Sequence, residues 1–414
     1  IESNEKIESW WNEVGTVPIM KKGQIPDPKD YDLEDGEEDD GLSLDLELLR
    51  NKKGFLEIET PILIKGTPEG SREYLVPSRL HPGSFYVLPQ SPQQLKQLCM
   101  VAGLERYFQI ARCFRDEDQR GDRQPEFTQL DEELSFVEQD DILQINEKLL
   151  IDLTKEFLPE KKIMQEPFPR MTWHEVMNKY GSDKPDIRFD LAFVDVSEIM
   201  KTSGFKVFSD TVQKGGVVKA MRVPAGAKFS RKQIDDLTEV AKSKGAKGLA
   251  YMSMEDSGEV KSTFLKFLDE STQKALLEAL DLQKGDIAFF SADKFMTACE
   301  SLGQVRLVVA KMLNLLDENL LAYLWVREFP MFERDSETGN LQAMHHPFTR
   351  PMQEDIDLLN TDPEKARAVA HDVVLNGIEI GGGSMRIHER DLQSKVFSLM
   401  NISEVDAERR FGHM

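Results

Sequence analysis

Two strand-like stretches separated by a polar segment constrain the fold of this chain most. Residues 106–117 and 127–136 are rich in aromatic and apolar side chains, and residues 118–126 between them are polar. Strand-like runs joined in this way predict one long antiparallel hairpin. The whole chain has 414 residues, which exceeds what a single hydrophobic core usually supports, so we expect two or three domains.

The two faces of this hairpin differ in chemistry, because residues two apart in a strand share a face. Arg115 and Glu117 share a face of the first strand. On the second strand, one face carries Gln129, Asp131 and Glu133, and the other carries Leu130, Leu134 and Phe136. A solvated polar face is common in antiparallel sheets, and that alternative stays open. The aromatic Phe114 and Phe127 beside an arginine-rich loop favour a nucleotide-binding floor.

A short helix precedes the hairpin. Ser91 and Pro92 are expected as its N-cap and first residue, and Gly103 as its end. Gln93 and Lys96 are three residues apart and therefore lie on one side of the helix. That side presents an amide and an ammonium together.

A second hairpin is predicted around residue 376. Asn376-Gly377 is a favoured pair for a two-residue turn. With these residues in the turn, Val374 pairs with Glu379, and Asp372 lies on the face of Glu379 as a diagonal neighbour. Two convergent carboxylates beside a phosphate site are ligands that Mg²⁺ prefers. A solvated edge hairpin without a ligand is the alternative.

The residues on either side of this hairpin add further candidates. The glycines of residues 381–383 permit either a close approach of a ligand or a plain flexible turn. Arg386 lies in an apolar run, so its guanidinium needs an anionic partner, either a structural acid or a carboxylate ligand. The adjacent His345 and His346 point in different directions, so we expect hydrogen bonding to a substrate or core packing rather than a shared metal.

Composition narrows the class of protein. The three cysteines have no CxxC spacing, which argues against a zinc site and fits a reducing compartment. The net charge of −22 repels nucleic acid, so any RNA partner must be bound by local basic patches. No apolar stretch is long enough to cross a bilayer. The acidic residues 27–47 are expected to be a solvated segment, with an interaction tail as the alternative.

Taken together, these stretches resemble a class II aminoacyl-tRNA synthetase of the bacterial aspartyl type. Residues 114–129, which begin Phe-Arg-Asp-Glu and end Phe-Thr-Gln, resemble motif 2, and this match is the most specific. Residues 54–61 resemble the end of motif 1, and residues 67–70 resemble the mobile loop that closes over the amino acid. Other stretches similar to family signatures are residues 90–93, 345–348 and 381–388.

The resemblance implies an α+β fold in which helices flank an antiparallel sheet and an α+β domain is inserted. The expected parts are an acidic segment at 1–53, a first catalytic part at 54–189, the insertion at 190–314 and a second catalytic part at 315–414. Short apolar runs mixed with Lys and Gly in the third part independently favour a separate domain. The N-terminal anticodon-binding domain and motif 3 of the family are expected to be absent from this chain.

The resemblance also implies roles for individual residues. Those that would hold aspartate are Glu69, Gln93, Lys96, Arg115, Asp131, His345 and Arg386. Those that would bind ATP are Arg115, Asp116, Glu117, Gln124, Phe127 and Glu379, and those that would bind Mg²⁺ are Asp372 and Glu379. Arg115 would be the catalytic residue, bridging the amino-acid carboxylate and the α-phosphate. Lys96 and Arg386 would grip the side-chain carboxylate, a pairing suited to separating a carboxylate from an amide.

The implied activity is that of an aspartate–tRNA ligase that uses ATP and Mg²⁺. Its expected partners are L-aspartate, aspartate tRNA, with asparagine tRNA left open, and a second copy of the chain in a homodimer, with no membrane. Bacterial cytoplasm and an organelle matrix both fit. Two alternatives are a non-catalytic paralogue that binds aspartate, adenylate or a protein partner, and an amide-forming or asparagine-activating relative.

Overall fold

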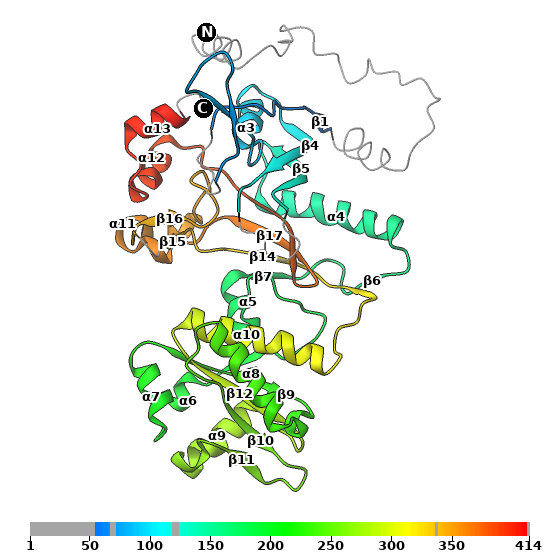
Figure 1. The fold of residues 1–414 in the computed structure, drawn as a ribbon, viewed down its shortest axis with the longest axis vertical. Coiled ribbons are helices and arrows are strands. Elements are labelled where there is room, and N and C mark those ends of the chain that lie inside the picture. Colours follow the sequence, from blue (N-terminus) through cyan, green and yellow to red (C-terminus); the bar gives the residue numbers. More distant parts are fainter. Residues whose placement is uncertain (1–53, 67–71, 118–123, 336–337, 412–414) are drawn as a thin grey trace. The chain divides into compact units, whose positions relative to one another are not determined.

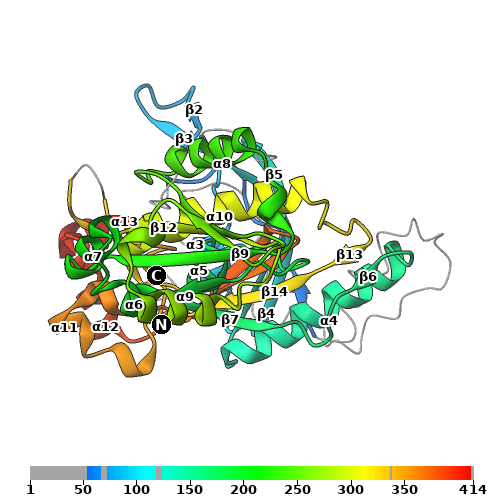
Figure 2. The same cartoon turned by 90° about the horizontal axis from the view of Figure 1, so that it is seen from below.

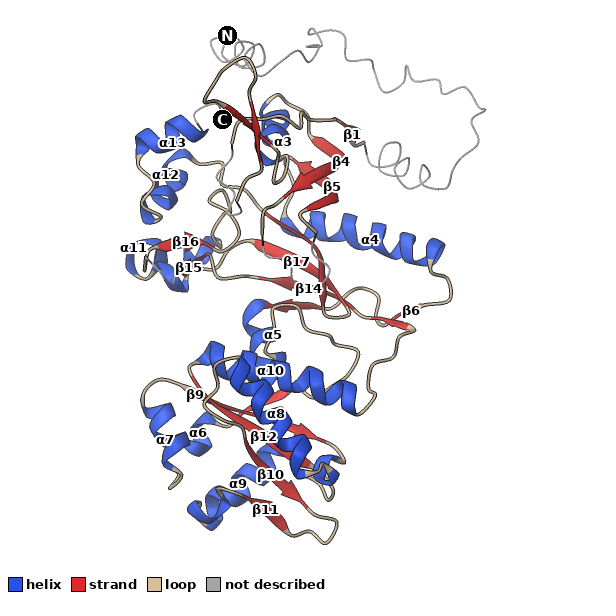
Figure 3. Ribbon diagram, in the orientation of Figure 1, coloured by secondary structure: helices blue, strands red, loops and turns tan. Residues whose placement is uncertain are grey.

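The computed structural model describes residues 54–66, 72–117, 124–335 and 338–411. The acidic segment at 27–47 and Glu69, for which roles are expected, lie outside these residues. The protein divides into two compact units: the first comprises residues 1–141, 335–341 and 388–414, and the second comprises residues 142–334 and 342–387. Both units mix helices with strands, as expected for an α+β protein (Figure 3).

The predicted long hairpin lies in the first unit and is confirmed. Its strands β4 (Arg106–Phe114) and β5 (Glu126–Leu134) pair antiparallel from Arg106 opposite Leu134 to Phe114 opposite Glu126. The strand β1 (Leu56–Glu57) pairs parallel with β4. The ladder ends at Phe114, three residues before the predicted end, although Arg115 still donates its N–H to Pro125 O at 2.8 Å.

The helix α3 (Gln93–Val101) packs on this hairpin. The prediction that Ser91 is its N-cap is wrong, because the helix begins at Gln93 and Pro92 takes the cap position. The Ser91 hydroxyl still accepts the N–H of Gln93 at 3.3 Å. The helix ends as predicted before Gly103, whose φ of +89° is a left-handed conformation that glycine adopts readily. The other elements of this unit are β2 (Leu75–Pro77), β3 (Phe85–Val87), α12 (Arg390–Leu399) and α13 (Glu404–Phe411).

The second unit contains a four-stranded sheet with the order β18-β17-β14-β7. These strands are β7 (Arg170–Thr172), β14 (Tyr323–Arg327), β17 (Ala370–Leu375) and β18 (Ile378–Ser384). The helix α4 (Gln139–Phe157) is tied to the sheet through the buried carboxylate of Glu147. This carboxylate accepts the indole N–H of Trp325 at 3.1 Å and the N–H of Phe168 at 3.2 Å. Both donors would be unsatisfied without it.

A five-stranded sheet with the order β11-β10-β12-β9-β8 fills the rest of this unit (Figure 1). Its strands are β8 (Phe193–Asp195), β9 (Val217–Val223), β10 (Ala250–Met254), β11 (Val260–Ser262) and β12 (Ile287–Asp293). The helices around it are α5 (Trp173–Tyr180), α6 (Ser197–Met200), α7 (Lys206–Gln213), α8 (Arg231–Ser243), α9 (Glu270–Leu280) and α10 (Phe295–Met312). Other short strands and helices are β6 (Lys162–Ile163), β13 (Leu320–Leu321), β15 (Phe332–Arg334), β16 (Leu341–Ala343) and α11 (Leu358–Thr361), and there are 3-10 turns at Gly226–Lys228, Leu265–Phe267, Gln353–Asp355 and Pro363–Lys365.

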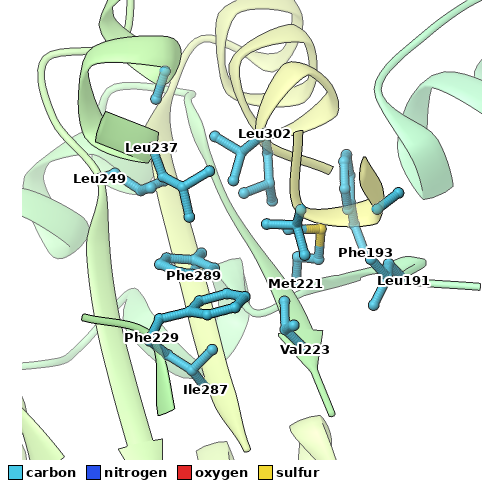
Figure 4. Close-up of a cluster of buried hydrophobic side chains, with 14 of the residues drawn as sticks. Leu191, Phe193, Met221, Val223, Phe229, Leu237, Leu249, Ile287, Phe289 and Leu302 are labelled. Carbon is cyan, nitrogen blue, oxygen red and sulfur yellow. The ribbon is translucent and has the colours of Figure 1, made fainter. Parts of the chain in front are cut away.

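Two hydrophobic layers cover the faces of this sheet. Alternate residues of β9 and β12 point to opposite faces, so Met221 and Phe289 pack with Leu237 of α8 and Leu302 of α10 (Figure 4). The other face packs against α6, α7 and α9. Figure 2 shows α8 and α10 on one side of the strands and α6 and α9 on the other. This sheet lies within residues 190–314, where the sequence predicts an insertion, and the exact boundaries stay a prediction.

The helices α5 and α10 approach so closely that only glycine fits between them. A Cβ on Gly303 of α10 would lie 2.6 Å from Gly181 O, and a Cβ on Gly181 would lie 2.1 Å from Cys299 O. Nearby, Arg306 of α10 is buried and donates to Phe189 O at 2.8 Å and Asp190 O at 2.9 Å. Burial lowers the pKa of Arg306 to about 10. These two hydrogen bonds attach Phe189 and Asp190, which precede the first strand of the five-stranded sheet, to α10.

Within the described residues, no helix combines the length and the apolar content that a membrane span requires.

Candidate active site

The polar face of the β4–β5 hairpin is its buried face. Asp131 and Gln109 lie opposite each other and are 9% and 8% exposed. The apolar Ile110 and Leu130, which lie on the other face, are 44% and 41% exposed. A merely solvated polar face is therefore wrong for this hairpin, because α3 covers the charged residues. Charged groups buried in this way are stable only when they are paired.

Lys96 of α3 pairs with two carboxylates of β5. Its ammonium lies 2.7 Å from Asp131 Oδ1 and 3.3 Å from Glu133 Oε2. It also donates to the carbonyl oxygen of Glu132 at 3.3 Å. The three side chains carry a net negative charge, and Asp131 Oδ2 has no hydrogen-bond partner within the described part of the chain. This buried acceptor is suited to a cationic group of a ligand.

Tyr107 lies beside this cluster and was missed by sequence reasoning. Its side chain is completely buried, and its hydroxyl donates to Gln109 Oε1 at 2.8 Å. The hydroxyl of Thr60 donates to the same oxygen at 2.9 Å. Burial raises the pKa of Tyr107, and the negative charge of Asp131 raises it further. Tyr107 is an even number of residues from Arg115 and therefore lies on the polar face of β4. This alternation was the sequence pattern that could have identified it.

Arg115 and Phe127 are brought together at the open end of the hairpin. The guanidinium carbon of Arg115 lies 5.0 Å from the centre of the Phe127 ring, and its Nε donates to Gln90 O at 3.3 Å. A guanidinium held over an aromatic ring by a cation–π interaction retains N–H groups that can bind an anion. Glu117 and Gln124, assigned to ATP by resemblance, are exposed on either side of the loop.

Gln93 and Asp116 complete the predicted residues of the first unit. Gln93 is buried at the start of α3, and its amide donates to Gln97 Oε1 at 3.3 Å. Asp116 forms an isolated bridge with Arg72, whose guanidinium lies 3.8 Å from its carboxylate. Both side chains of that pair are about half or more exposed, so the ion pair adds little stability.

The predicted second hairpin is confirmed in the second unit. Leu375 pairs with Ile378, which leaves Asn376 and Gly377 as the turn with φ values of +52° and +86°. Such positive values at both positions match the turn that Asn-Gly favours. Val374 pairs with Glu379 as predicted, and the register shifts by a bulge between Val373 and Val374.

Asp372 and Glu379 interact electrostatically on this hairpin. Asp372 is 8% exposed, and burial raises its pKa well above the ordinary value. The negative charges of Glu379 and Asp183 raise it further, whereas Lys184 opposes them. Gly382 lies opposite Asp372, and a Cβ there would lie only 2.3 Å from Asp372 Oδ1. The glycine leaves room for this carboxylate.

Two histidines and Arg386 lie close enough to Asp372 and Glu379 for their charges to interact. Desolvation lowers the pKa of His345, Glu379 opposes this shift, and Arg386 reinforces it. Burial lowers the pKa of His371 to about 3, and Arg386 and His345 contribute. Arg386 donates to the carbonyl oxygen and to the hydroxyl of Ser384, the first at 3.1 Å. Opposite charges therefore converge at this end of the four-stranded sheet.

The structure thus gathers the predicted site residues in two sets. The set in the first unit is Gln93, Lys96, Arg115, Asp116, Glu117, Gln124, Phe127 and Asp131, and the set in the second unit is His345, Asp372, Glu379 and Arg386. No group of three or more possible metal-binding side chains occurs in the described ranges. Asp372 and Glu379 provide two carboxylates, which suits Mg²⁺ because it takes further ligands from water and phosphate. Asp183 and Lys184, which face this pair, were not predicted.

The match to a family model over most of the sequence identifies the class to which this chain belongs. The chain belongs to the family of class II tRNA synthetases for D, K and N, whose model matches residues 47–414. It is 54% identical over 365 residues to the aspartate–tRNA(Asp/Asn) ligase of Bacillus subtilis (strain 168), covering 88% of this chain and 61% of that protein.

A second curated relative and one solved structure are also similar to the chain. The chain is 52% identical over 364 residues to the aspartate–tRNA ligase of Ruminiclostridium cellulolyticum, covering 88% of this chain and 61% of the relative. It therefore spans about three fifths of the length of these curated relatives. A solved structure of asparaginyl-tRNA synthetase from Pyrococcus horikoshii, complexed with asparaginyl-adenylate, is similar with a TM-score of 0.41 and 16% identity, covering 89% of this chain and 57% of that one.

Proposed function

We propose that the protein acts as an aspartate–tRNA ligase. The observation that carries this proposal is the buried ammonium of Lys96 between Asp131 and Glu133. Aspartate has two carboxylates and an ammonium, so its site needs both cationic and anionic groups. Lys96 offers the cation, and Asp131 Oδ2 offers an acceptor that has no partner among the described residues.

The roles in aspartate binding follow from these charges and from the resemblance. The resemblance assigns both Lys96 and Arg386 to the side-chain carboxylate, and it assigns Asp131 to the α-ammonium, from which its carboxylate would accept hydrogen bonds. The side chain of asparagine is an uncharged amide and would offer neither cation a ligand carboxylate, which discriminates against it. The residues assigned to aspartate by resemblance alone are Glu69, Gln93 and His345.

ATP is assigned to the open end of the β4–β5 hairpin. Arg115 neutralises charge between the aspartate α-carboxylate and the α-phosphate, while Phe127 holds its guanidinium in place. The α-carboxylate then attacks the α-phosphorus and pyrophosphate leaves. The reaction needs no protein nucleophile, because positioning and charge neutralisation lower the barrier. Asp116, Glu117 and Gln124 are assigned to the nucleotide and its loop, as is Glu379 of the second unit.

Asp372 and Glu379 are proposed to hold Mg²⁺. Both are hard oxygen donors, and their mutual repulsion is relieved by a divalent cation. When bound, the ion neutralises phosphate oxygens of ATP. Gly382 contributes by leaving the carboxylate of Asp372 free of steric conflict.

The proposed partners are L-aspartate, aspartate tRNA and a second copy of the chain. Relatives are named as ligases for aspartate tRNA and for both aspartate and asparagine tRNA, so asparagine tRNA is a second substrate to test. The three cysteines are all free thiols, which supports a reducing compartment such as the bacterial cytoplasm or an organelle matrix.

Exchange of radioactive pyrophosphate into ATP tests the activity directly. We expect exchange that depends on aspartate and is not supported by asparagine. Absence of aspartate-dependent exchange would favour the alternative of a non-catalytic paralogue, and exchange with asparagine would favour the asparagine-activating relative.

A further inference from the structure

A loop at residues 181–188 lies against the Asp372–Glu379 hairpin and has no role in the function proposed above. The loop is held in shape by its own polar groups: Ser182 Oγ accepts the N–H of Lys184 at 3.1 Å. Asp186 accepts from Nε of Arg188 at 3.1 Å and from Nη2 at 2.6 Å. Arg188 also donates to Asp317 O at 3.2 Å. The position of Lys184 is therefore built into the fold.

The loop contacts the turn of the hairpin. A Cβ on Gly377 would lie 3.1 Å from the Cβ of Asp186, so loop and turn are in close contact at this point. The ammonium of Lys184 lies 3.5 Å from Glu379 Oε2, and these residues are 195 positions apart in sequence. Each of the two side chains is 37% exposed. Water and ions can therefore reach the pair.

The groups around Glu379 carry an excess of negative charge. The carboxylates of Asp183, Asp372 and Glu379 interact with one another or with His345, and Lys184 is the cation whose field reaches Asp372. Arg386 acts on His345 and His371 from the other side. An exposed ion pair alone adds little stability. A cation beside two repelling carboxylates has a larger effect, because it offsets their repulsion.

We propose that Lys184 is the resident counter-cation of the Asp372–Glu379 pair, which a divalent cation must displace from Glu379 when it binds. The inference rests on the proposed metal-binding role of these carboxylates and adds a residue that sets their affinity. Lys184 keeps the carboxylates together in the metal-free protein. It also weakens binding of a metal without nucleotide, because two cations compete for the same oxygen atoms.

The test measures Mn²⁺ binding to the full chain by electron paramagnetic resonance, without ATP. Lys184→Met removes the competing charge, and we expect Mn²⁺ to bind about five- to tenfold more tightly, as the loss of one nearby charge predicts. The gain should shrink as ionic strength rises, because the pair is accessible to solvent. Lys184→Arg keeps the charge and should bind Mn²⁺ as the unmodified protein does.

Two controls separate this inference from the proposed function. Lys155→Met removes a lysine of another exposed ion pair in the same unit, 3.0 Å from Glu166, and should leave Mn²⁺ affinity unchanged. Glu379→Gln should weaken Mn²⁺ binding at least tenfold if this carboxylate is a ligand. Weaker binding in Glu379→Gln together with unchanged or weaker binding in Lys184→Met overturns the role of Lys184 alone. No change in Glu379→Gln overturns the metal site and the role of Lys184 with it.

Discussion

The ammonium of Lys96 lies 2.7 Å from the carboxylate of Asp131, and both side chains are at least nine-tenths buried. One partner comes from a helix and the other from a strand, 35 positions apart in sequence. Burial makes each charge dependent on the other. A ligand that reaches this pair meets an ammonium and a carboxylate in a fixed geometry, which is the requirement for recognising a small zwitterion.

Replacing Lys96 by Met tests this pair. The change leaves Asp131 and Glu133 buried without their cation, so we expect a loss of about 3 kcal/mol in the free energy of unfolding. Aspartate-dependent pyrophosphate exchange should fall at least about 100-fold, measured at a temperature where the variant is folded. Lys148→Met, which breaks an exposed pair with Asp152, is the matched control and should change neither quantity appreciably. Retained exchange in Lys96→Met would refute the assignment to aspartate.

Gly382→Ala tests whether the carboxylate of Asp372 needs the space that is left by the missing side chain of Gly382. The new Cβ would lie 2.3 Å from Asp372 Oδ1, so the carboxylate must move. We expect Mn²⁺ affinity to fall about tenfold, in line with other changes beside metal ligands. Gly248→Ala is the control, since nothing lies within 4 Å of its added Cβ. Equal affinities in the two variants would show that Asp372 is not a ligand.

Arg306→Met tests the attachment of α10 to the start of the five-stranded domain. The variant keeps much of the packing between the Tyr180 and Phe189 rings but leaves Phe189 O and Asp190 O without these donors. We expect a loss of about 2 kcal/mol in the free energy of unfolding, measured by urea denaturation. The exposed Arg231→Met should lie within about 0.5 kcal/mol of the unmodified protein. A similar small effect of Arg306→Met would mean that water replaces the lost donors.

His371 makes stability depend on pH. Its pKa is about 3 in the folded protein, against 6.5 for an ordinary histidine. Below pH 6.5 the unfolded chain therefore takes up a proton that the folded protein does not, and stability falls as pH decreases towards 3. The free energy of unfolding then decreases by at most about 1.4 kcal/mol for each pH unit. Urea denaturation from pH 7 to 5 should show a smaller decrease for His371→Asn than for the unmodified protein. Parallel curves would exclude His371 as a source of the pH dependence.

Local patterns in the sequence determined both hairpins and their pairing. The alternation of residues along β4 and β5 placed Asp131 and Glu133 on one face, because the side-chain period of a strand is two. Asn376 and Gly377 specified the second turn, since few other residues adopt left-handed conformations at both positions. These features depend on interactions within a few residues, which a sequence displays directly.

The tertiary structure alone decided which face was buried and which distant charges met. Parity groups residues on a face but does not say what covers it, so only the packing of α3 showed that the polar face of the hairpin is buried. The contact of Lys184 with Glu379 joins residues 195 positions apart, and no local preference of either residue encodes it. Such pairs form because packing of whole elements brings their side chains together, and the energy of that packing is spread over many residues.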